Sequence, residues 1–262
     1  MKDKNVKLSK NDDWSGKWKD QKITKLDRIV ITNTPFSDIH NVLKKHLPSE
    51  GGNECIEIGC YPGGFMRYFS EEFGYKVSGL EYIEWCGIHA AELLKDAGID
   101  ATLYNGDIFK WNPEKQWDIV CSFGLVEHFK DINSVVDKHM SLVKPDGWLV
   151  LEFPNHAGLY GKVMKLVNKV NYSIHNQMSM EYALNIVRQN KEFKVYDASY
   201  RGHIGFLNSG LYPWLRKKGK LWYFIIGGAA IFLEKLFKYL PNTRMLSPYS
   251  LIVAKKLQSN DS

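Results

Sequence analysis

Residues 55–65 read CIEIGCYPGGF, an apolar run that passes into a turn rich in glycine. Cys55, Ile56 and Ile58 suit a strand that is buried on both faces of a parallel sheet. The glycines that follow allow backbone torsions and close approaches that a Cβ atom would block. The stretch therefore predicts a strand, a tight turn and a helix, with a ligand bound against the backbone of the turn.

The turn lacks the features of a phosphate-binding loop. No Gly-Lys-Ser or Gly-Lys-Thr follows it, and its glycines do not complete the G-x-G-x-x-G spacing of dinucleotide-binding folds. The ligand is therefore not expected to be held by nucleotide phosphates. What remains is the pattern E-x-G-x-x-x-G, formed by Glu57, Gly59 and Gly63.

Strands and helices alternate along most of the chain. Predicted strands span 55–58, 76–80, 101–104, 117–123, 148–153, 193–198 and 249–255. Predicted helices span 35–47, 64–73, 85–95, 132–143 and 179–189. A turn is expected at 144–147, and irregular structure at 1–30 and 155–178.

This alternation predicts an α/β fold, namely a Rossmann-like, doubly wound, mostly parallel seven-stranded sheet that binds its ligand beyond the carboxyl ends of the strands. We expect an N-terminal extension and helix at 1–48 and one domain at 49–262. That domain would carry insertions at about 155–178 and 200–247, the second of them hydrophobic and helical and placed before the last strand.

The composition is ordinary for one globular domain with an elaboration. The chain has 262 residues, of which 44% are hydrophobic and 24% charged. The charged N-terminus contains no apolar segment typical of a secretory signal, so we expect a cytoplasmic location. The cysteines lack C-x-x-C spacing and are expected to be reduced core thiols. They are Cys55, Cys60, Cys86 and Cys121.

The net charge of +6 is concentrated in one region. Residues 211–246 contain seven basic residues and one acid, Glu234, so this window alone carries +6. The basic residues are Arg216, Lys217, Lys218, Lys220, Lys235, Lys238 and Arg244. Because they alternate with aliphatic residues and the remaining chain is near neutral, we expect no nucleic-acid partner.

The E-x-G-x-x-x-G turn, together with its downstream partners, resembles motif I of the class I S-adenosylmethionine-dependent methyltransferases. WDIVCSFGLVEHFKD at 117–131 resembles the fourth-strand motif of that family, and KPDGWLVLEFPN at 144–155 resembles the turn and strand that follow. The matches cover about residues 50–155 in the expected order. One departure is Tyr61, which replaces the usual middle glycine and precedes Pro62, so its side chain is expected to face the ligand.

The resemblance implies S-adenosyl-L-methionine as cofactor, with the acid and turn of motif I holding its amino-acid end. Glu81, at the tip of the second strand, would accept hydrogen bonds from both ribose hydroxyls; a solvated strand cap is the alternative. Asp107 would contact the adenine amino group; an Asx turn or helix cap is the alternative. The predicted cofactor-binding residues are Glu57, Gly59, Tyr61, Gly63, Glu81, Tyr82, Asp107, Ile108 and Phe123.

Three histidines are candidates for catalysis. Methyl transfer depends mainly on alignment, but a hydroxyl acceptor must lose a proton, and a histidine is a suitable recipient. His128 lies in the VEHF motif, His156 follows the fifth strand, and His203 lies in RGHIGF after the sixth. A packing or orienting role is the alternative for His128. No histidine and carboxylate cluster has clear metal-ligand spacing, so no metal site is predicted.

Residues 221–233, LWYFIIGGAAIFL, form an uncharged segment that is too short to span a bilayer. Three interpretations compete: a lid or core helix over the substrate, an oligomer contact, and a helix in a membrane interface. The flanking lysines, together with Trp214, Trp222 and Tyr223, suit the third interpretation. We therefore consider peripheral membrane contact through residues 211–246, at the inner face of the membrane.

The expected activity is methyl transfer to a small-molecule or lipid-linked acceptor. The segments CYPGGF, VEHF, EFPNH and GHIGF resemble methyltransferases of bacterial surface-polysaccharide pathways, which implies an oxygen of a sugar as the acceptor. A quinone or other isoprenoid acceptor is the alternative. A second alternative is a methyltransferase-like protein that binds a partner without turnover. The sequence indicates no oligomeric state.

Overall fold

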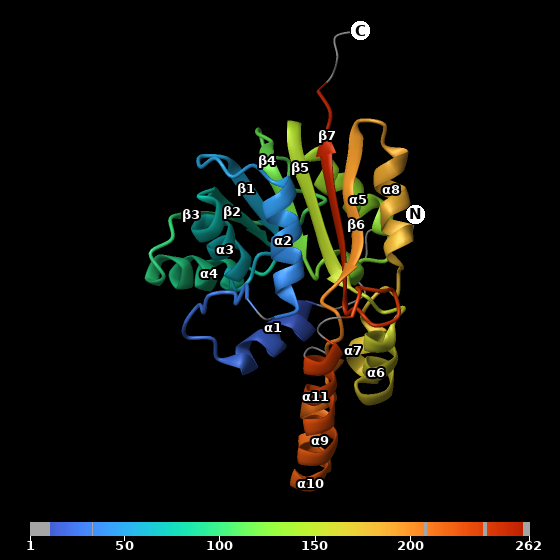
Figure 1. The fold of residues 1–262 in the computed structure, drawn as a ribbon. Coiled ribbons are helices and arrows are strands. Elements are labelled where there is room, and N and C mark those ends of the chain that lie inside the picture. The colour runs from blue at the N-terminus through green and yellow to red at the C-terminus, as the bar shows by residue number, and fades with distance from the viewer. Residues whose placement is uncertain (1–10, 33, 207–208, 238–239, 259–262) are drawn as a thin grey trace, which may run out of the picture.

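The computed structural model describes residues 11–32, 34–206, 209–237 and 240–258. A seven-stranded sheet of order β3-β2-β1-β4-β5-β7-β6 lies at its centre, with helices on both faces (Figure 1). β7 is antiparallel to β5 and β6, and the other pairs are parallel. The predicted fold class is confirmed. The strands are β1 (Glu54–Ile58), β2 (Lys76–Glu81), β3 (Ala101–Asn105), β4 (Trp117–Phe123), β5 (Val143–Pro154), β6 (Phe193–Arg201) and β7 (Tyr249–Lys256).

Five helices lie where the apolar periodicity predicts them and cover the two faces of the sheet. They are α2 (Phe36–His46), α3 (Gly64–Phe73), α4 (Glu84–Asp96), α5 (Ile132–Ser141) and α8 (Met180–Gln189). Buried residues of α2, α3 and α4 join one hydrophobic core, and those of α5 and α8 join the other. Two cores separated by a sheet are the architecture of a doubly wound fold.

The pleat of each strand divides its side chains between the two cores. In β4, Ile119 and Cys121 face the α2–α3–α4 side, and Val120 faces the α5–α8 side. All three are fully buried, and burial of such a side chain contributes about 1.5–3 kcal/mol. The four cysteines are free and buried, as expected for core thiols.

Capping residues set the ends of several helices. α3 ends at Gly74 in the left-handed region (φ 69°), where the amides of Gly74 and Tyr75 donate to the carbonyls of Ser70 and Phe69. Asp131 caps α5 by accepting a hydrogen bond from the Ser134 amide at 3.2 Å. Such local signals explain why the sequence predicts these helices to within a few residues.

The N-terminal segment differs from its prediction. Residues 11–21 form helix α1 (Asn11–Gln21) rather than irregular structure. The helix contacts α4, because the Trp85 indole N–H donates to Ser15 Oγ at 3.0 Å. Trp18 of α1 packs edge-on against Tyr61 in the turn after β1. The prediction failed because this polar segment has no apolar stripe and depends on contacts with distant residues.

The region around β5 also differs from its prediction. β5 begins at Val143, so the predicted turn at 144–147 belongs to the strand, where Asp146 has a positive φ of 61°. The register between β4 and β5 shifts between Trp117 and Ile119, which accommodates the irregularity as a bulge. Helices α6 (Leu159–Val167) and α7 (Lys169–Ser173) occupy part of the segment predicted to be irregular.

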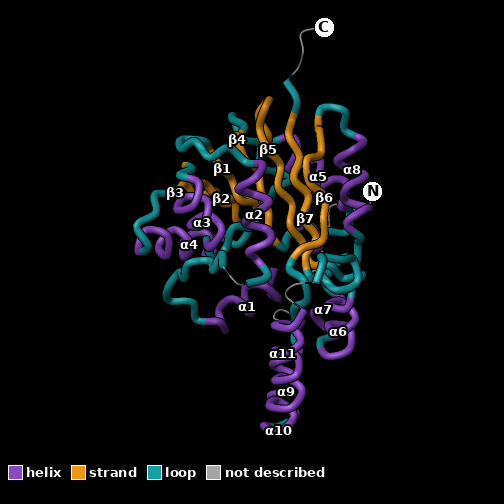
Figure 2. The backbone as a smooth tube through the Cα atoms, in the orientation of Figure 1, coloured by secondary structure: helices purple, strands orange, loops and turns teal. Residues whose placement is uncertain are grey.

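The helical insertion before the last strand is present. It contains α9 (Leu211–Lys218), α10 (Lys220–Trp222), the π-helical turn η3 (Tyr223–Gly227) and α11 (Gly228–Leu236). These helices extend away from the sheet as a narrow arm, which we call the projection, residues 211–237 (Figures 1 and 2). Within the described residues, we find no helix that combines the length and the apolarity needed to cross a membrane.

Candidate active site

The turn between β1 and α3 is shaped by two glycines in left-handed conformations. Gly59 has φ 74° and Gly63 has φ 103°. A Cβ atom on Gly59 would lie 2.8 Å from Leu125 Cδ1, which is closer than packed atoms allow. This contact brings the turn against the loop after β4. The glycine-rich pattern thus reflects a close approach between the first and fourth strand ends, as well as tight backbone torsions.

Two buried carboxyl groups meet beside this turn. Glu57 is buried in β1, and burial, followed by the nearby charge of Glu81, raises its pKa well above the usual range. Glu57 Oε2 has no hydrogen-bond partner among the described residues. Glu81, at the end of β2, accepts hydrogen bonds from the amide of Ile83 at 3.0 Å and, more weakly, from that of Tyr61 at 3.4 Å. The arrangement places two buried carboxyl groups beside the glycine turn, in surroundings that disfavour charge on Glu57 unless a positively charged ligand compensates it.

The third acid follows the next strand. Asp107 Oδ1 accepts a hydrogen bond from the Phe109 amide at 3.0 Å, so the residue forms the Asx turn that the sequence left as an alternative. The carbonyl of Glu81 accepts from the amide of Gly106 at 3.0 Å, which joins the ends of β2 and β3. Glu57 near the end of β1, Glu81 at the end of β2 and Asp107 just after β3 therefore lie at the carboxyl ends of three adjacent parallel strands.

The side chain of Tyr61 packs on α1 and α4. Its ring contacts Trp18 and Trp85 with centroids at 5.2 and 5.6 Å, and its hydroxyl lies 3.0 Å from His89 Nδ1. The ring is buried, and burial raises the pKa of the hydroxyl. These contacts make Tyr61 an anchor between the turn, α1 and α4.

The other residues predicted to bind cofactor have different environments. Tyr82 is exposed directly after β2, whereas Ile108 is buried in the α5–α8 core. Phe123, at the end of β4, stacks on Phe65 of α3 with centroids 3.6 Å apart and planes 8° apart. Phe123 is thereby fixed at the strand end that adjoins the turn.

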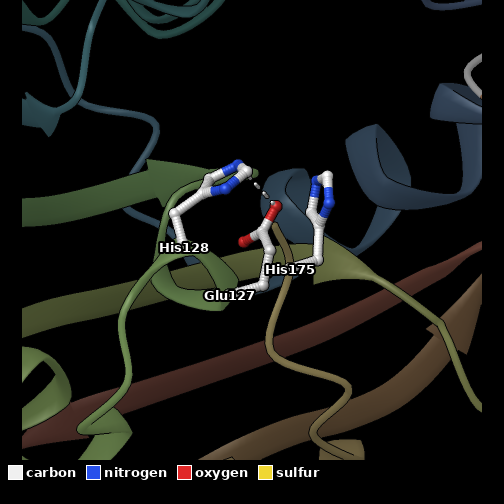
Figure 3. Close-up of side chains that lie close together, drawn as sticks. All are labelled: Glu127, His128 and His175. Carbon is white, nitrogen blue, oxygen red and sulfur yellow. Dashed lines mark ion pairs between the residues drawn. The ribbon is translucent and has the colours of Figure 1, made fainter. Parts of the chain in front are cut away.

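A second polar cluster lies beyond the ends of β4 and β5. Glu127 and His128 belong to a short 3₁₀ turn, η1 (Val126–His128), and His175 belongs to the segment between α7 and α8. Figure 3 shows the two imidazoles on either side of the Glu127 carboxyl group. All three side chains are buried, and Glu127 is only 1% exposed. The cluster combines an acid and two imidazoles in a site shielded from water.

Backbone contacts bring His175 to this position. The amide of Asn176 donates to the carbonyl of Glu127 at 2.5 Å, and its side-chain amide donates to the carbonyl of Phe129 at 3.2 Å. The rings of His128 and His175 lie with centroids 4.4 Å apart. Sequence reasoning missed His175 because it stands alone in a segment without periodicity, and no local pattern signals its contact with η1.

His156 extends the cluster. It follows β5, is buried, and its ring centroid lies 5.0 Å from that of His175. Neither ring nitrogen has a hydrogen-bond partner among the described residues. The structure therefore brings together two of the three predicted catalytic histidines, His128 and His156, and adds His175 to them.

The third predicted histidine, His203, has a different set of contacts. Its Nδ1 lies 2.8 Å from the carbonyl oxygen of Leu240, and its Nε2 lies 3.2 Å from a carboxylate oxygen of Asp38. Both ring nitrogens are thus occupied by contacts that join α2 to the segment after the projection. The contacts of His203 in this structure are structural ones.

Burial shifts the proton affinities in the cluster. The pKa of Glu127 rises to about 8 because its carboxyl group is desolvated. The pKa of Glu152, in β5, is raised well above the usual range by burial and then by the charge of Glu127. The pKa of His156 is lowered to about 3 by burial and then by His175. The site therefore disfavours charge on each of these groups in the absence of a compensating ligand.

Comparison with known protein families identifies a methyltransferase domain over residues 32–216. The matched range contains the glycine-rich turn, the three acids and the Glu127–His128–His175 cluster. No curated protein sequence matches the chain.

Solved structures share the fold at low identity. Coclaurine N-methyltransferase has a TM-score of 0.58 and 13% identity, over 88% of this chain and 76% of its own. Geranyl diphosphate C-methyltransferase from Streptomyces coelicolor has a TM-score of 0.55 and 16% identity, over 83% and 78% of the two chains. A mycolic acid cyclopropane synthase has a TM-score of 0.58 and 14% identity, over 82% of both. At these identities the likeness concerns the fold.

Proposed function

Since the chain belongs to the class I S-adenosylmethionine-dependent methyltransferases, we propose that it transfers the cofactor's methyl group to an oxygen of a lipid-carried acceptor. The cofactor supplies a methyl group activated by a sulfonium. The protein's part is to align that group with the acceptor in a site that excludes water.

The residues around the β1–α3 turn fit this cofactor. The turn has no Cβ atoms at Gly59 and Gly63, where φ is positive. The buried Oε2 of Glu57, which has no hydrogen-bond partner among the described residues, suits an ammonium group, which the cofactor's amino-acid end carries. Glu81 and Asp107, at the next two strand ends, are the proposed partners of the ribose hydroxyls and the adenine amino group. Tyr61 would support the turn from behind through its contacts with Trp18 and Trp85.

The buried cluster beyond β4 supports an acceptor position beside the cofactor. Leu125 touches the glycine turn and lies two residues before Glu127, so the turn and the cluster are adjacent. In the proposed reaction the acceptor oxygen bonds to the methyl carbon while the carbon–sulfur electron pair passes to sulfur. The hydroxyl proton must leave, and His128 is the first candidate to receive it, with His156 second.

The projection supports a lipid-carried acceptor. Leu215 and Ala230 are buried, but several of its largest apolar side chains face outward. Phe224 is 72% exposed, Leu221 67% and Phe232 63%. Soluble monomers rarely display so many large apolar side chains on one element, and such patches mark interaction surfaces. The arm is firmly attached at its base, where Glu234 accepts hydrogen bonds from the Phe206 amide at 2.9 Å and the Tyr212 hydroxyl at 3.1 Å.

The charge and placement of the projection point to an anionic bilayer as its partner. Arg216, Lys217 and Lys218 lie in the last turn of α9, and Lys220 begins α10 after Gly219. Basic residues beside aromatic ones favour the headgroup region of anionic membranes. β5 and β6 both run antiparallel to β7, so they point in the same direction. The projection, which follows β6, therefore begins at the same end of the sheet as the active site.

The acceptor proposed first is a sugar of a lipid-linked glycan from a bacterial surface-polysaccharide pathway, on the resemblance described above. An isoprenoid quinone would use the same apolar arm. The test is transfer of radiolabelled methyl from S-adenosylmethionine to polyprenyl-diphosphate-linked glycans, to the same glycans after release from lipid, and to a quinol. Faster labelling of the lipid-linked glycan supports the proposal. Preference for released glycans contradicts the lipid requirement, and labelling of the quinol alone contradicts the sugar.

Membrane contact is tested separately by flotation of the full chain with vesicles containing phosphatidylglycerol. We expect the wild type to float with the vesicles and Phe224→Ser combined with Phe232→Ser to remain unbound. Ile88→Ser is the matched control, because Ile88 is also exposed but belongs to α4. Absence of flotation by the wild type, or concentration-dependent dimerisation abolished by the same double substitution, would assign the projection to a protein contact instead.

A further inference from the structure

The Glu127–His128–His175 cluster has the spacing of a ligand set. One potential donor atom from each side chain lies within 4.8 Å of the others. His128 Nε2 and Glu127 Oε1 are 3.6 Å apart, which is longer than the usual 2.7–3.2 Å of a hydrogen bond. It is close to the separation of about 3.4 Å between two ligands that each lie about 2.1 Å from a tetrahedral zinc ion. The pair is therefore positioned better for a shared cation than for each other.

The orientation of His175 fits the same interpretation. Its Nδ1 lies 2.5 Å from the carbonyl oxygen of Asn171, which can only accept a hydrogen bond. Nδ1 therefore carries a proton, and in the neutral imidazole Nε2 then holds the lone pair that can bind a metal ion. Histidines that bind metals almost always donate their other ring N–H to such an acceptor, which fixes both tautomer and ring direction.

The neighbours of the cluster leave buried polar atoms that a cation would satisfy. Glu127 Oε2 and Glu152 Oε1 are buried without hydrogen-bond partners among the described residues, as are both ring nitrogens of His156. A buried carboxyl group without a partner costs free energy, and two in proximity cost more. A divalent cation would compensate both acids at once.

We propose that Glu127, His128 and His175 bind a divalent first-row transition metal ion, and that, given the proposed function, this ion holds the acceptor oxygen beside the methyl group. Two imidazoles and one carboxylate favour zinc, iron or manganese over magnesium or calcium, which prefer oxygen ligands alone. Three protein ligands leave at least one coordination position for the acceptor. His156 lies close enough to His175 to serve as a fourth ligand or as a partner of the bound oxygen.

Metal binding would change the role of His128 and leave the acceptor's position unchanged. As a metal ligand, His128 Nε2 would not receive the acceptor's proton. The cation would instead lower the proton affinity of a coordinated hydroxyl, as metal ions do for bound water, and His156 would receive the proton that leaves. The substrate class would then be acceptors with a hydroxyl that can reach the cation, which includes sugars and catechol-like rings.

The test is titration of the chelator-treated full chain with Zn²⁺, followed calorimetrically. We expect one equivalent to bind, and affinity to fall at least about 100-fold in His175→Ala and in Glu127→Gln, since loss of a ligand should exceed the 10–100-fold typical of outer contacts. His46→Gln is the matched control, because His46 lies at the end of α2 and is outside the cluster. Equal binding in the wild type and both cluster variants would overturn the proposal.

X-ray absorption of the wild-type zinc complex gives a result that does not depend on variants. We expect scattering from two imidazoles, with zinc to nitrogen distances of about 2.0–2.1 Å. A shell without imidazole, or no binding of Zn²⁺ or Co²⁺ by the wild type, contradicts the site. S-adenosylmethionine is titrated into the same samples. If the cation binds and the cofactor does not, the proposed function fails while the metal site stands, and the reverse result removes only the metal.

Discussion

The carboxyl end of the sheet and the projection differ in the kind of side chain that they bury or expose. The carboxyl end of the sheet buries ionisable groups, since Glu57, Glu127 and Glu152 are all buried. The projection exposes apolar groups, with Phe224 and Phe232 turned outward. Each arrangement costs free energy in an isolated chain, because buried acids lose hydration and exposed rings order water. Each therefore indicates a missing partner.

The two partners suggested by this difference have different chemistry. The buried acids call for ligands with positive charge or hydrogen-bond donors, such as the ammonium and hydroxyls of the cofactor and a divalent cation. The exposed rings and the adjacent lysines call for an apolar surface bordered by negative charge. Because both regions begin at the carboxyl end of the sheet, a substrate with a lipid part and a polar part would contact both of them.

The largest expected contrast between the regions is in folding stability. Phe69 of α3 is 0% exposed, so Phe69→Ala should lower the free energy of unfolding by about 3–5 kcal/mol. Phe224→Ala in the projection should change it by less than about 0.5 kcal/mol, as exposed substitutions usually do. Urea denaturation of the two variants measures both values. Equal destabilisation would mean that the projection packs as a core and would break the comparison.

Lowering the pH should reduce the folding stability of the sheet domain through protonation of His139 in α5. Burial lowers the pKa of this imidazole from 6.5 to about 4. The folded state therefore binds the proton at a lower pH than the unfolded state does. The folded state accommodates the neutral imidazole above pH 6.5. Stability should fall as the pH drops from about 6.5 to about 4, by at most about 3.4 kcal/mol. His139→Gln should lose this part of the pH dependence, measured as unfolding free energy against pH. The same slope in both proteins would contradict it.

The smallest expected change in stability is that of a single alanine substitution in the glycine turn. Gly59→Ala should cost about 1–2 kcal/mol from its positive φ, plus the contact with Leu125 at 2.8 Å. Gly98→Ala is the matched control, since Gly98 has φ 76° but open space around it. Thermal denaturation should show Gly59→Ala as the less stable variant, and Leu125→Ala should restore part of the difference. Equal stability of the two alanine variants would show that the close approach has no consequence.

Much of the fold follows from local signals in the sequence. The burial of Cys55, Ile56 and Ile58, and the glycines at both ends of α3, are visible as apolar runs and turn residues. α1 carries no such signal, because it is polar and is held through Trp18 and Ser15 by residues far along the chain. The turn expected at 144–147 was wrong because pairing of Val143 with Trp117 extends β5 through it.

The candidate site likewise contains residues that the sequence predicts and residues that only the fold reveals. The acids at the strand ends were predictable, because parallel strands bring their carboxyl ends to one edge. The Glu127–His128–His175 cluster was not predictable, since it depends on the hydrogen bonds of Asn176 to Glu127 and Phe129, which no spacing reveals. The contacts of His203 with Leu240 and Asp38 are likewise tertiary. Local patterns locate strand ends, and only the folded chain shows which loops meet there.

Calorimetric titration with S-adenosylmethionine tests the central claim, that the buried sheet edge binds the cofactor independently of the projection. We expect wild-type protein and the Phe224→Ser/Phe232→Ser variant to bind it with equal affinity. Glu81→Ala should bind at least about 100-fold more weakly, because two hydrogen bonds to a charged group contribute about 1.5–3 kcal/mol each. Absence of binding by the wild type, or unchanged affinity in Glu81→Ala, would contradict the account.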